Sequence, residues 1–227
     1  MNIILDIFNY IFVAIIIGVA STWVVLIRSM LRTFHDAPFL DKFEKKEHEK
    51  PKVSIILPAR NEEKFIGKCL DSLLDQDYDN YEIIVINDSS EDSTAEIIKK
   101  YEKKFSKVIL VDAKSKPEGW VGKNWACMEG YKKSTGNLLL FTDSDTVHAS
   151  SVISLAVSHL LSLELDALTV IPRMLCLDPI TKITLPMISV FLHTRFSALR
   201  VNDKSKNTGY FFGSFFIIKK TTYDSIG

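Results

Sequence analysis

The chain has 227 residues, 47% of them apolar, and its 28 Lys and Arg residues balance 28 Asp and Glu residues. This length and apolar content can bury one substantial core, so we expect one soluble domain with an appendage. The balanced charge argues against a broad nucleic-acid footprint, and we expect no nucleic-acid partner. Three cysteines without paired spacing indicate neither a zinc site nor a disulfide framework, and they fit a reducing compartment.

The appendage is the N-terminal segment. From Phe8 to Ile27 the chain is almost wholly apolar, and at ~1.5 Å per residue this run spans the ~30 Å hydrocarbon layer of a bilayer. Residues 1–33 therefore predict a single-pass transmembrane helix with its flanks. Basic residues follow the run and none precedes it, which predicts that the rest of the chain faces the cytoplasm at the cell membrane. A cleaved signal peptide is the competing interpretation, although the run is long and lacks a basic region before it.

A charged tract, residues 34–51, follows this helix. It mixes both signs with few apolar residues, which predicts a solvated linker. Residues 52–227 then form the soluble domain. The sequence stops at Gly227, directly after a pattern typical of the start of a helix, so we expect this domain to be truncated at its C-terminus.

Short apolar segments alternate with helical patterns along the soluble domain. Buried strands are expected at residues 53–57, where Pro58 should end the strand, and at 81–86, 108–111, 138–142 and 167–171. Helices are expected at residues 65–74, near 93–101, and at about 124–133 and 150–163. This alternation with apolar strands predicts an α/β fold in which a mostly parallel sheet has helices on both faces.

The pattern changes after residue 178. Residues 179–200 mix apolar, aromatic and basic side chains. Two interpretations stay open: a segment that lies in the lipid headgroup layer, and a helix that packs on the sheet with one wet face. The next segment, residues 209–220, predicts a strand with small residues at Gly213 and Ser214, where another group must approach closely.

The segment from Leu138 to Thr146 contains the strongest site signal. Its apolar run ends in Asp143-Ser144-Asp145, which predicts a buried strand whose C-terminal tip delivers two carboxylates into a crevice. Such a pair can hold a hard divalent cation, which in turn holds a diphosphate. An ordinary polar turn after a core strand would explain the same residues. Asp88 follows the second strand and should occupy the equivalent topological position.

Five motifs occur in this order: Pro58–Glu63, Asn87–Ser90, Gly122–Lys123 with Ala126 and Gly130, Asp143–Asp145, and Gly213–Ser214 with Lys219–Lys220 and Ser225–Gly227. Together they resemble the family 2 glycosyltransferases, whose nucleotide-sugar-binding fold is Rossmann-like and of the A type. The loop Pro117–Lys123 and the segment Val201–Asp203 are similar to membrane-anchored members associated with hopanoid and carotenoid glycosylation.

The resemblance implies roles for specific residues. The nucleotide-sugar pocket would be formed by Ala59, Asn61, Glu62, Asp88, Lys123 and Asp143. Asp143 and Asp145 would be the catalytic carboxylates and metal ligands, with Asp145 on a Mn²⁺ or Mg²⁺ ion that bridges the two phosphates. Asp88 would accept hydrogen bonds from the base, and Lys123 would lie near the base or phosphates. Gly213 and Ser214 would face the donor sugar and the acceptor.

The expected function is an inverting, metal-dependent transfer of a sugar from a nucleoside diphosphate sugar to a lipid-like or membrane-borne acceptor. In the family, a carboxylate base is expected beyond the Gly-Ser segment and the helix after it, which places it past Gly227. Two alternatives therefore stay open. One is a polyprenyl-phosphate sugar synthase of the same fold, and the other is a non-catalytic nucleotide-sugar-binding or scaffold protein.

Overall fold

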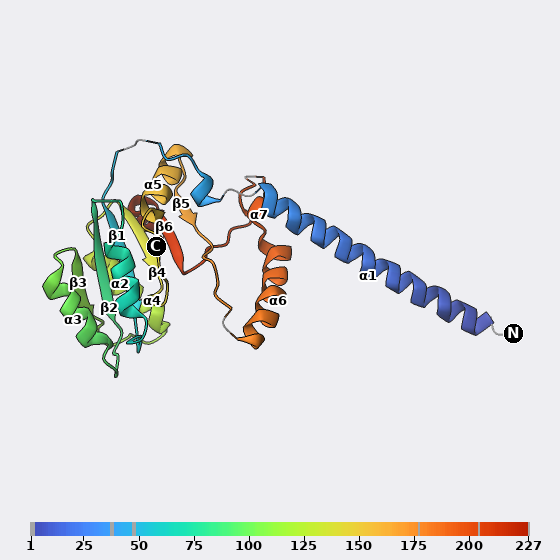
Figure 1. The fold of residues 1–227 in the computed structure, drawn as a ribbon, viewed down its shortest axis with the longest axis horizontal. Coiled ribbons are helices and arrows are strands. Elements are labelled where there is room, and N and C mark those ends of the chain that lie inside the picture. The colour runs from blue at the N-terminus through green and yellow to red at the C-terminus, as the bar shows by residue number, and fades with distance from the viewer. Residues whose placement is uncertain (1–2, 37–38, 47–48, 177, 204, 227) are drawn as a thin grey trace. The chain divides into compact units, whose positions relative to one another are not determined.

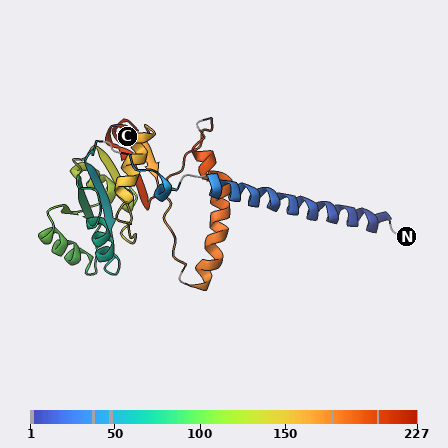
Figure 2. The same cartoon turned by 45° about the horizontal axis from the view of Figure 1, so that its top comes forward.

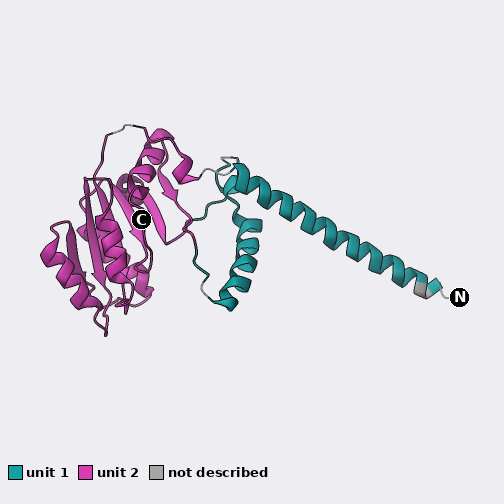
Figure 3. Ribbon diagram, in the orientation of Figure 1, with its two compact units in different colours: residues 1–38, 174–210 teal, residues 39–173, 211–227 magenta. Residues whose placement is uncertain are grey.

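The structure is a computed structural model (Figure 1). It describes residues 3–36, 39–46, 49–176, 178–203 and 205–226. The chain forms two compact units (Figure 3). The smaller unit comprises residues 1–38 and 174–210, and the larger unit comprises residues 39–173 and 211–227.

The larger unit is built on a six-stranded sheet in the order β3-β2-β1-β4-β6-β5. Its strands are β1 (Val53–Ala59), β2 (Tyr81–Asn87), β3 (Val108–Asp112), β4 (Leu138–Thr142), β5 (Ala167–Thr169) and β6 (Phe215–Lys219). The first four strands pair in parallel, while β6 is antiparallel to both β4 and β5. The predicted mostly parallel α/β sheet is confirmed.

Helices cover both faces of this sheet (Figure 2). One face packs against α2 (Ile66–Leu74), α3 (Thr94–Lys104) and α5 (Val152–Ser162), and the short 3₁₀ helix η1 (Leu40–Lys42) joins this side. The other face packs against α4 (Gly122–Lys133) and α8 (Lys220–Ile226). Alternate residues of β1 supply the two cores, with Ile55 and Leu57 on the first face and Ile56 on the second.

Strand β1 is longer than the sequence predicted, because it continues through Pro58 to Ala59. The Val53 N–H donates to Asn80 O of the segment before β2. Because N–H groups alternate in direction along a strand, every second residue counted from Val53 directs its N–H toward β2. Pro58 belongs to the other residues, whose N–H groups point the opposite way. These groups face β4, which pairs with β1 only as far as Ile56. The missing N–H of Pro58 therefore costs the sheet no hydrogen bond.

The smaller unit contains α1 (Ile3–Asp36), α6 (Pro179–Phe196) and α7 (Ala198–Val201). Helix α1 has the length and apolar composition needed to cross a bilayer, and a signal sequence would meet the same criteria. The Asp178 side chain caps α6 by accepting a 2.9 Å hydrogen bond from the Thr181 N–H. None of the residues of α6, all of which the structure describes, is buried.

We predict that Gly136, in the turn before β4, tolerates no side chain. A Cβ at this position would lie 2.7 Å from Lys52 O and 2.7 Å from Ser54 N, and the backbone beside a central strand cannot easily move away. Gly136→Ala should therefore lower the free energy of unfolding by about 1–3 kcal/mol. Chemical denaturation of the purified chain measures this change.

Gly67→Ala in α2 is the matched control. Its Cβ would only touch Tyr101 Oη, at 3.7 Å, and alanine favours a helix interior over glycine by about 1 kcal/mol. The two substitutions should therefore shift stability in opposite directions. A Gly136→Ala variant as stable as the unsubstituted chain would refute the close approach to β1.

Candidate functional site

The C-terminal ends of the parallel strands β1, β2 and β4 surround a pocket of about 370 Å³, a size typical of small-molecule sites. Its lining residues are Pro58, Ala59, Arg60, Glu62, Asp88, Gly122, Lys123, Asp143, Ser144 and Asp145. The structure therefore brings together the predicted residues Ala59, Glu62, Asp88, Lys123, Asp143 and Asp145. This is the edge at which open α/β sheets bind their ligands.

The first turn of α4 closes one side of the pocket. The helix begins at Gly122, about two residues earlier than its pattern predicted, and this places Lys123 in its first turn. The Lys123 ammonium forms an ion pair with the carboxylate of Asp143, the residue directly after β4. A Cβ on Gly122 would lie 3.4 Å from Asp88 Oδ2, within van der Waals contact, so the start of α4 lies beside the end of β2.

The pocket carries excess negative charge, because four of its lining residues are acidic and two are basic. Burial raises the pKa of Glu62, and the nearby carboxylates of Asp145, Asp92 and Asp143 raise it further. Arg60 is a pocket residue to which the sequence assigned no role, and its Nη1 lies 4.0 Å from Asp88 Oδ2. The remaining negative charge favours a cation beside Asp143 and Asp145.

These two carboxylates fit a hard divalent cation. Mg²⁺ and ions like it prefer oxygen ligands and are held by one or two carboxylates together with substrate phosphates and water. Within the described part of the chain, no group of three or more His, Cys, Asp and Glu side chains is arranged to hold a metal. Asp143 and Asp145 therefore suit an ion whose other ligands come from a diphosphate and water.

Asn61 lies beside the pocket but is not among its lining residues. Its backbone has φ +56°, a left-handed conformation that asparagine tolerates better than most residues. Its Oδ1 accepts a 2.8 Å hydrogen bond from the Glu91 N–H, and its own N–H donates to Ser90 Oγ at 3.2 Å. Asn61 thus joins the loop after β1 to the loop after β2 by hydrogen bonds. One of these bonds reaches a residue 30 positions away in the sequence.

Gly213 and Ser214 precede β6 and lie near the tip of β4. Ser214 O accepts a 2.8 Å hydrogen bond from Thr142 Oγ1, and a Cβ on Gly213 would lie 3.6 Å from Lys123 Nζ. Neither residue lines the pocket itself. Gly213 is therefore a neighbour of Lys123, and Ser214 is bonded to the residue directly before Asp143.

No pattern in the sequence indicated the partner of Thr142. His148 Nε2 lies 3.1 Å from Thr142 Oγ1. Since the threonine hydroxyl donates its proton to Ser214 O, the histidine must donate from a protonated Nε2. Burial lowers the pKa of His148 to about 4, so this ring is neutral at pH 7. His148, Thr142 and Ser214 therefore form a short chain of hydrogen bonds that joins the tip of β4 to the segment before β6.

Thr142→Val should loosen this connection. The valine keeps the shape of the side chain but leaves Ser214 O and His148 Nε2 without their partner, which we expect to lower the free energy of unfolding by about 1–3 kcal/mol. Amide hydrogen exchange of residues 211–216 should become faster. Thr221→Val, the same change at an exposed position of α8, is the control. Unchanged exchange in the Thr142 variant would contradict the proposed connection.

Comparisons with known proteins show what this chain is similar to. The family model described as glycosyl transferase family 2 matches residues 54–227. The glycosyltransferase GlyA of Streptococcus pneumoniae is 34% identical over 94 residues, which are 41% of this chain and 13% of that protein. The 4,4'-diaponeurosporenoate glycosyltransferase of Staphylococcus haemolyticus is 37% identical over 128 residues, which are 56% of this chain and 32% of that protein.

A solved structure has the same architecture. The mannosyltransferase PcManGT from Pyrobaculum calidifontis, in complex with GDP-Man and Mn²⁺, superposes with a TM-score of 0.66 at 20% identity, covering 94% of this chain and 58% of that one. This likeness shows the A-type glycosyltransferase fold. Because the family match extends over most of the chain, the protein belongs to glycosyltransferase family 2.

Proposed function

We propose that the pocket binds a nucleoside diphosphate sugar and that the protein transfers the sugar, with inversion, to a lipid-like or membrane-borne acceptor. One observation carries this proposal: Asp88, Lys123, Asp143 and Asp145 come from three different elements and line one pocket at the C-terminal edge of the sheet. A pocket that contains both a carboxylate pair and a lysine ammonium can hold a metal together with a diphosphate.

The proposed roles follow from these positions. Asp88, at the end of β2, accepts hydrogen bonds from the nucleotide base, while Ala59 and Glu62 form the wall after β1. Lys123 is the charge-assisted donor to the phosphates. Asn61 stabilises this wall through its hydrogen bonds to the loop after β2. Its proposed role is therefore to position the wall, whereas the resemblance implied a direct contact with the nucleotide.

Asp143 and Asp145 would hold a Mn²⁺ or Mg²⁺ ion. When bound, the ion neutralises charge on the departing nucleoside diphosphate. The chain's own contribution is to fix the two carboxylates: Asp143 follows the buried strand β4 directly and is paired with Lys123. An inverting transfer also needs a general base for the acceptor hydroxyl, and we assign that role to none of the residues that line the pocket.

The acceptor proposal rests on the apolar parts of the chain. We propose that residues 1–33 are a single-pass membrane anchor, residues 34–51 a linker, and residues 52–227 the glycosyltransferase domain on the cytoplasmic side. Helix α1 is long and apolar enough to span a bilayer, and the relative from Staphylococcus haemolyticus is named for a carotenoid substrate. Gly213 and Ser214 would face the donor sugar and the acceptor.

Calorimetry of the full chain in detergent tests the donor site. UDP- and GDP-sugars are titrated with Mn²⁺ and with a chelator, and we expect binding of one donor that requires the metal. Donor binding with neither transfer nor hydrolysis of a labelled sugar would favour the non-catalytic nucleotide-sugar-binding protein. Transfer to a polyprenyl phosphate would identify the synthase instead. If neither donor binds in the presence of Mn²⁺, the proposal is wrong.

A further inference from the structure

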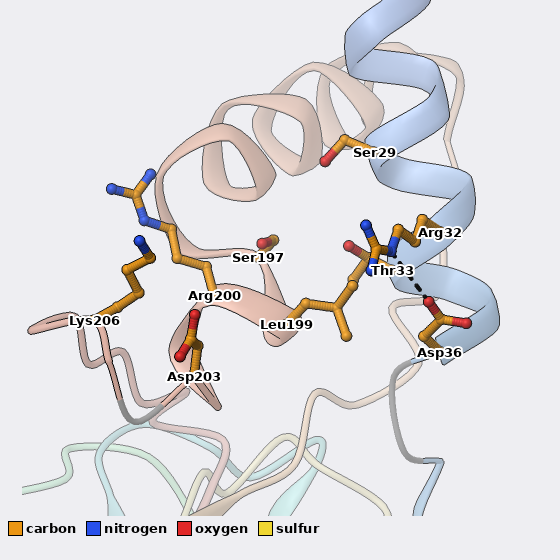
Figure 4. Close-up of a pocket in the computed structure, with 9 residues that line it drawn as sticks. All are labelled: Ser29, Arg32, Thr33, Asp36, Ser197, Leu199, Arg200, Asp203 and Lys206. Carbon is orange, nitrogen blue, oxygen red and sulfur yellow. Dashed lines mark hydrogen bonds and ion pairs between the residues drawn. The ribbon is translucent and has the colours of Figure 1, made fainter.

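A second pocket, of about 700 Å³, lies within the smaller unit, where the C-terminal end of α1 meets the segment from the end of α6 through α7 (Figure 4). Its lining residues are Ser29, Arg32, Thr33, Asp36, Ser197, Leu199, Arg200, Asp203 and Lys206. All of them belong to the same compact unit, and none belongs to the nucleotide-sugar pocket.

The position of this pocket along α1 sets its depth relative to a bilayer. The apolar run ends at Ile27, and Ser29 lies about 3 Å further along the helix axis. Ser29 Oγ is 3.1 Å from His193 Nε2, near the end of α6. If α1 spans the membrane, as the proposed function holds, Ser29 and His193 lie at the level of the lipid headgroups, and the pocket begins there and extends along the last two turns of α1, away from the hydrocarbon layer.

Helix α6 presents an apolar face without protein cover. Ile180, Ile183, Met187 and Phe191 are between 67% and 72% exposed, and their spacing of three and four residues places them on one side of the helix. A helix that lies at headgroup level with such a face can bury it in the acyl boundary of the bilayer. The connection of His193 to α1 places the C-terminal part of α6 at that level.

The charge around this pocket is positive. The segments Arg28–Asp36 and His193–Lys206 contain six Lys and Arg residues but two Asp residues, so they attract anions. Asp36 forms an ion pair with Arg32 and a hydrogen bond with His35, and among the described residues Arg200 has no carboxylate partner. Arg200 and Lys206 both line the pocket, and Figure 4 draws their side chains on the same side of the view, across from Arg32.

The Asp203 carboxylate forms hydrogen bonds within its own loop. Asp203 Oδ1 accepts hydrogen bonds from the N–H and the Oγ of Ser205, at 2.9 and 2.7 Å. These bonds lower the pKa of Asp203, and the Lys206 charge lowers it further. The Lys206 charge thus acts on Asp203. The planar guanidinium of Arg200, which has no carboxylate partner among the described residues, suits the paired hydrogen bonds to a phosphate.

We propose that this pocket binds the phosphate headgroup of an anionic membrane phospholipid, with Arg200 and Lys206 on the phosphate and the apolar face of α6 against the acyl chains. The inference rests on the proposed function in one respect, the use of α1 as a membrane anchor. It adds a lipid-binding site that is separate from the donor pocket. Such a site would fix the smaller unit at the membrane surface.

Native mass spectrometry of the full chain tests this site. The protein is reconstituted into vesicles that contain equal amounts of phosphatidylglycerol and phosphatidylcholine, extracted with mild detergent, and examined for retained lipid. We expect preferential retention of phosphatidylglycerol, reduced about fivefold for each charge removed in Arg200→Gln with Lys206→Gln. The matched control is Lys99→Gln with Lys100→Gln, two exposed positions of α3.

The outcomes separate this site from the donor pocket. An unchanged lipid preference in the Arg200 and Lys206 double variant would overturn the proposal. Displacement of the lipid by millimolar inorganic phosphate would also overturn it, because it would reveal a general anion site. Nucleotide-sugar binding is measured on the same samples and should be equal in all of them. Its loss in every sample would refute the proposed function without altering the result for the lipid.

Discussion

Asp145→Ala should abolish the metal-dependent binding of the nucleoside diphosphate sugar. The pocket offers two carboxylates to a cation, and that of Asp143 is already paired with Lys123, so Asp145 is the one with no lysine partner in the described structure. Substitution of second-shell residues alone costs about 10- to 100-fold in metal affinity, so loss of a direct ligand should cost at least about 100-fold. Calorimetry with Mn²⁺ and the preferred donor measures this loss.

A matched control and a second variant make this result specific. Asp79→Ala removes a carboxylate whose side chain is 91% exposed, and it should leave binding unchanged. Asp145→Asn keeps the shape of the side chain, removes its charge, and should lose binding nearly as completely as the alanine variant. It should also lower the pKa of Glu62, because Asp145 is one of the charges that raise it. Full metal-dependent affinity in Asp145→Ala would refute the assignment of the metal ligands.

The sequence predicted the centre of this site because it depends on local pattern and topology. Asp143 and Asp145 follow a buried strand, and Asp88 follows another. The carboxyl ends of parallel strands meet at one edge, so knowledge of the sheet type was enough to bring these residues together. Lys123 was added to them only through the resemblance to the family 2 glycosyltransferases, because no local pattern connects its loop to these strand ends.

The remaining parts of the site depend on contacts that no local pattern encodes. The hydrogen bond between Thr142 and Ser214 O joins residues 72 positions apart, and His148 becomes relevant only through Thr142. Asn61 was expected to line the pocket. Its backbone is left-handed and its side chain accepts a hydrogen bond from the loop after β2, so it lies beside the pocket lining. Similarly, the spacing of apolar residues in α6 left two locations open, since an apolar stripe does not identify what covers it.

The buried Glu82 of β2 is the residue whose substitution should destabilise the chain most. Its side chain is 9% exposed and forms a 2.7 Å ion pair with Lys52. Its Oε1 accepts hydrogen bonds from Ser54 Oγ at 2.6 Å and from the N–H of Thr135 at 2.8 Å. Ser54 Oγ in turn accepts a bond from the Gly136 N–H. The carboxylate therefore joins β1 and β2 to the turn that leads into β4.

Glu82→Ala should lower the free energy of unfolding by about 3–5 kcal/mol, because removing one member of a buried ion pair leaves the other members without partners. Glu82→Gln should cost less, since an amide oxygen can still accept some of these bonds. Glu118→Gln, at an exposed position, is the control. Denaturation of the three variants at pH 7 provides the measurement, and a small effect of Glu82→Ala would contradict the coupling of β1, β2 and the turn.

The same network predicts how stability changes with pH. Burial alone would raise the pKa of Glu82, but the hydrogen bonds from Lys52, Ser54 and Thr135 outweigh burial and lower it. Its contribution is therefore fully present above the unfolded-state pKa of about 4.3, and it is lost as the pH falls through the lower pKa of the folded state. Glu82→Gln carries no titrating group at this position. Between pH 7 and pH 3 it should consequently lose less stability than the unsubstituted chain, whereas Glu118→Gln should follow the unsubstituted chain.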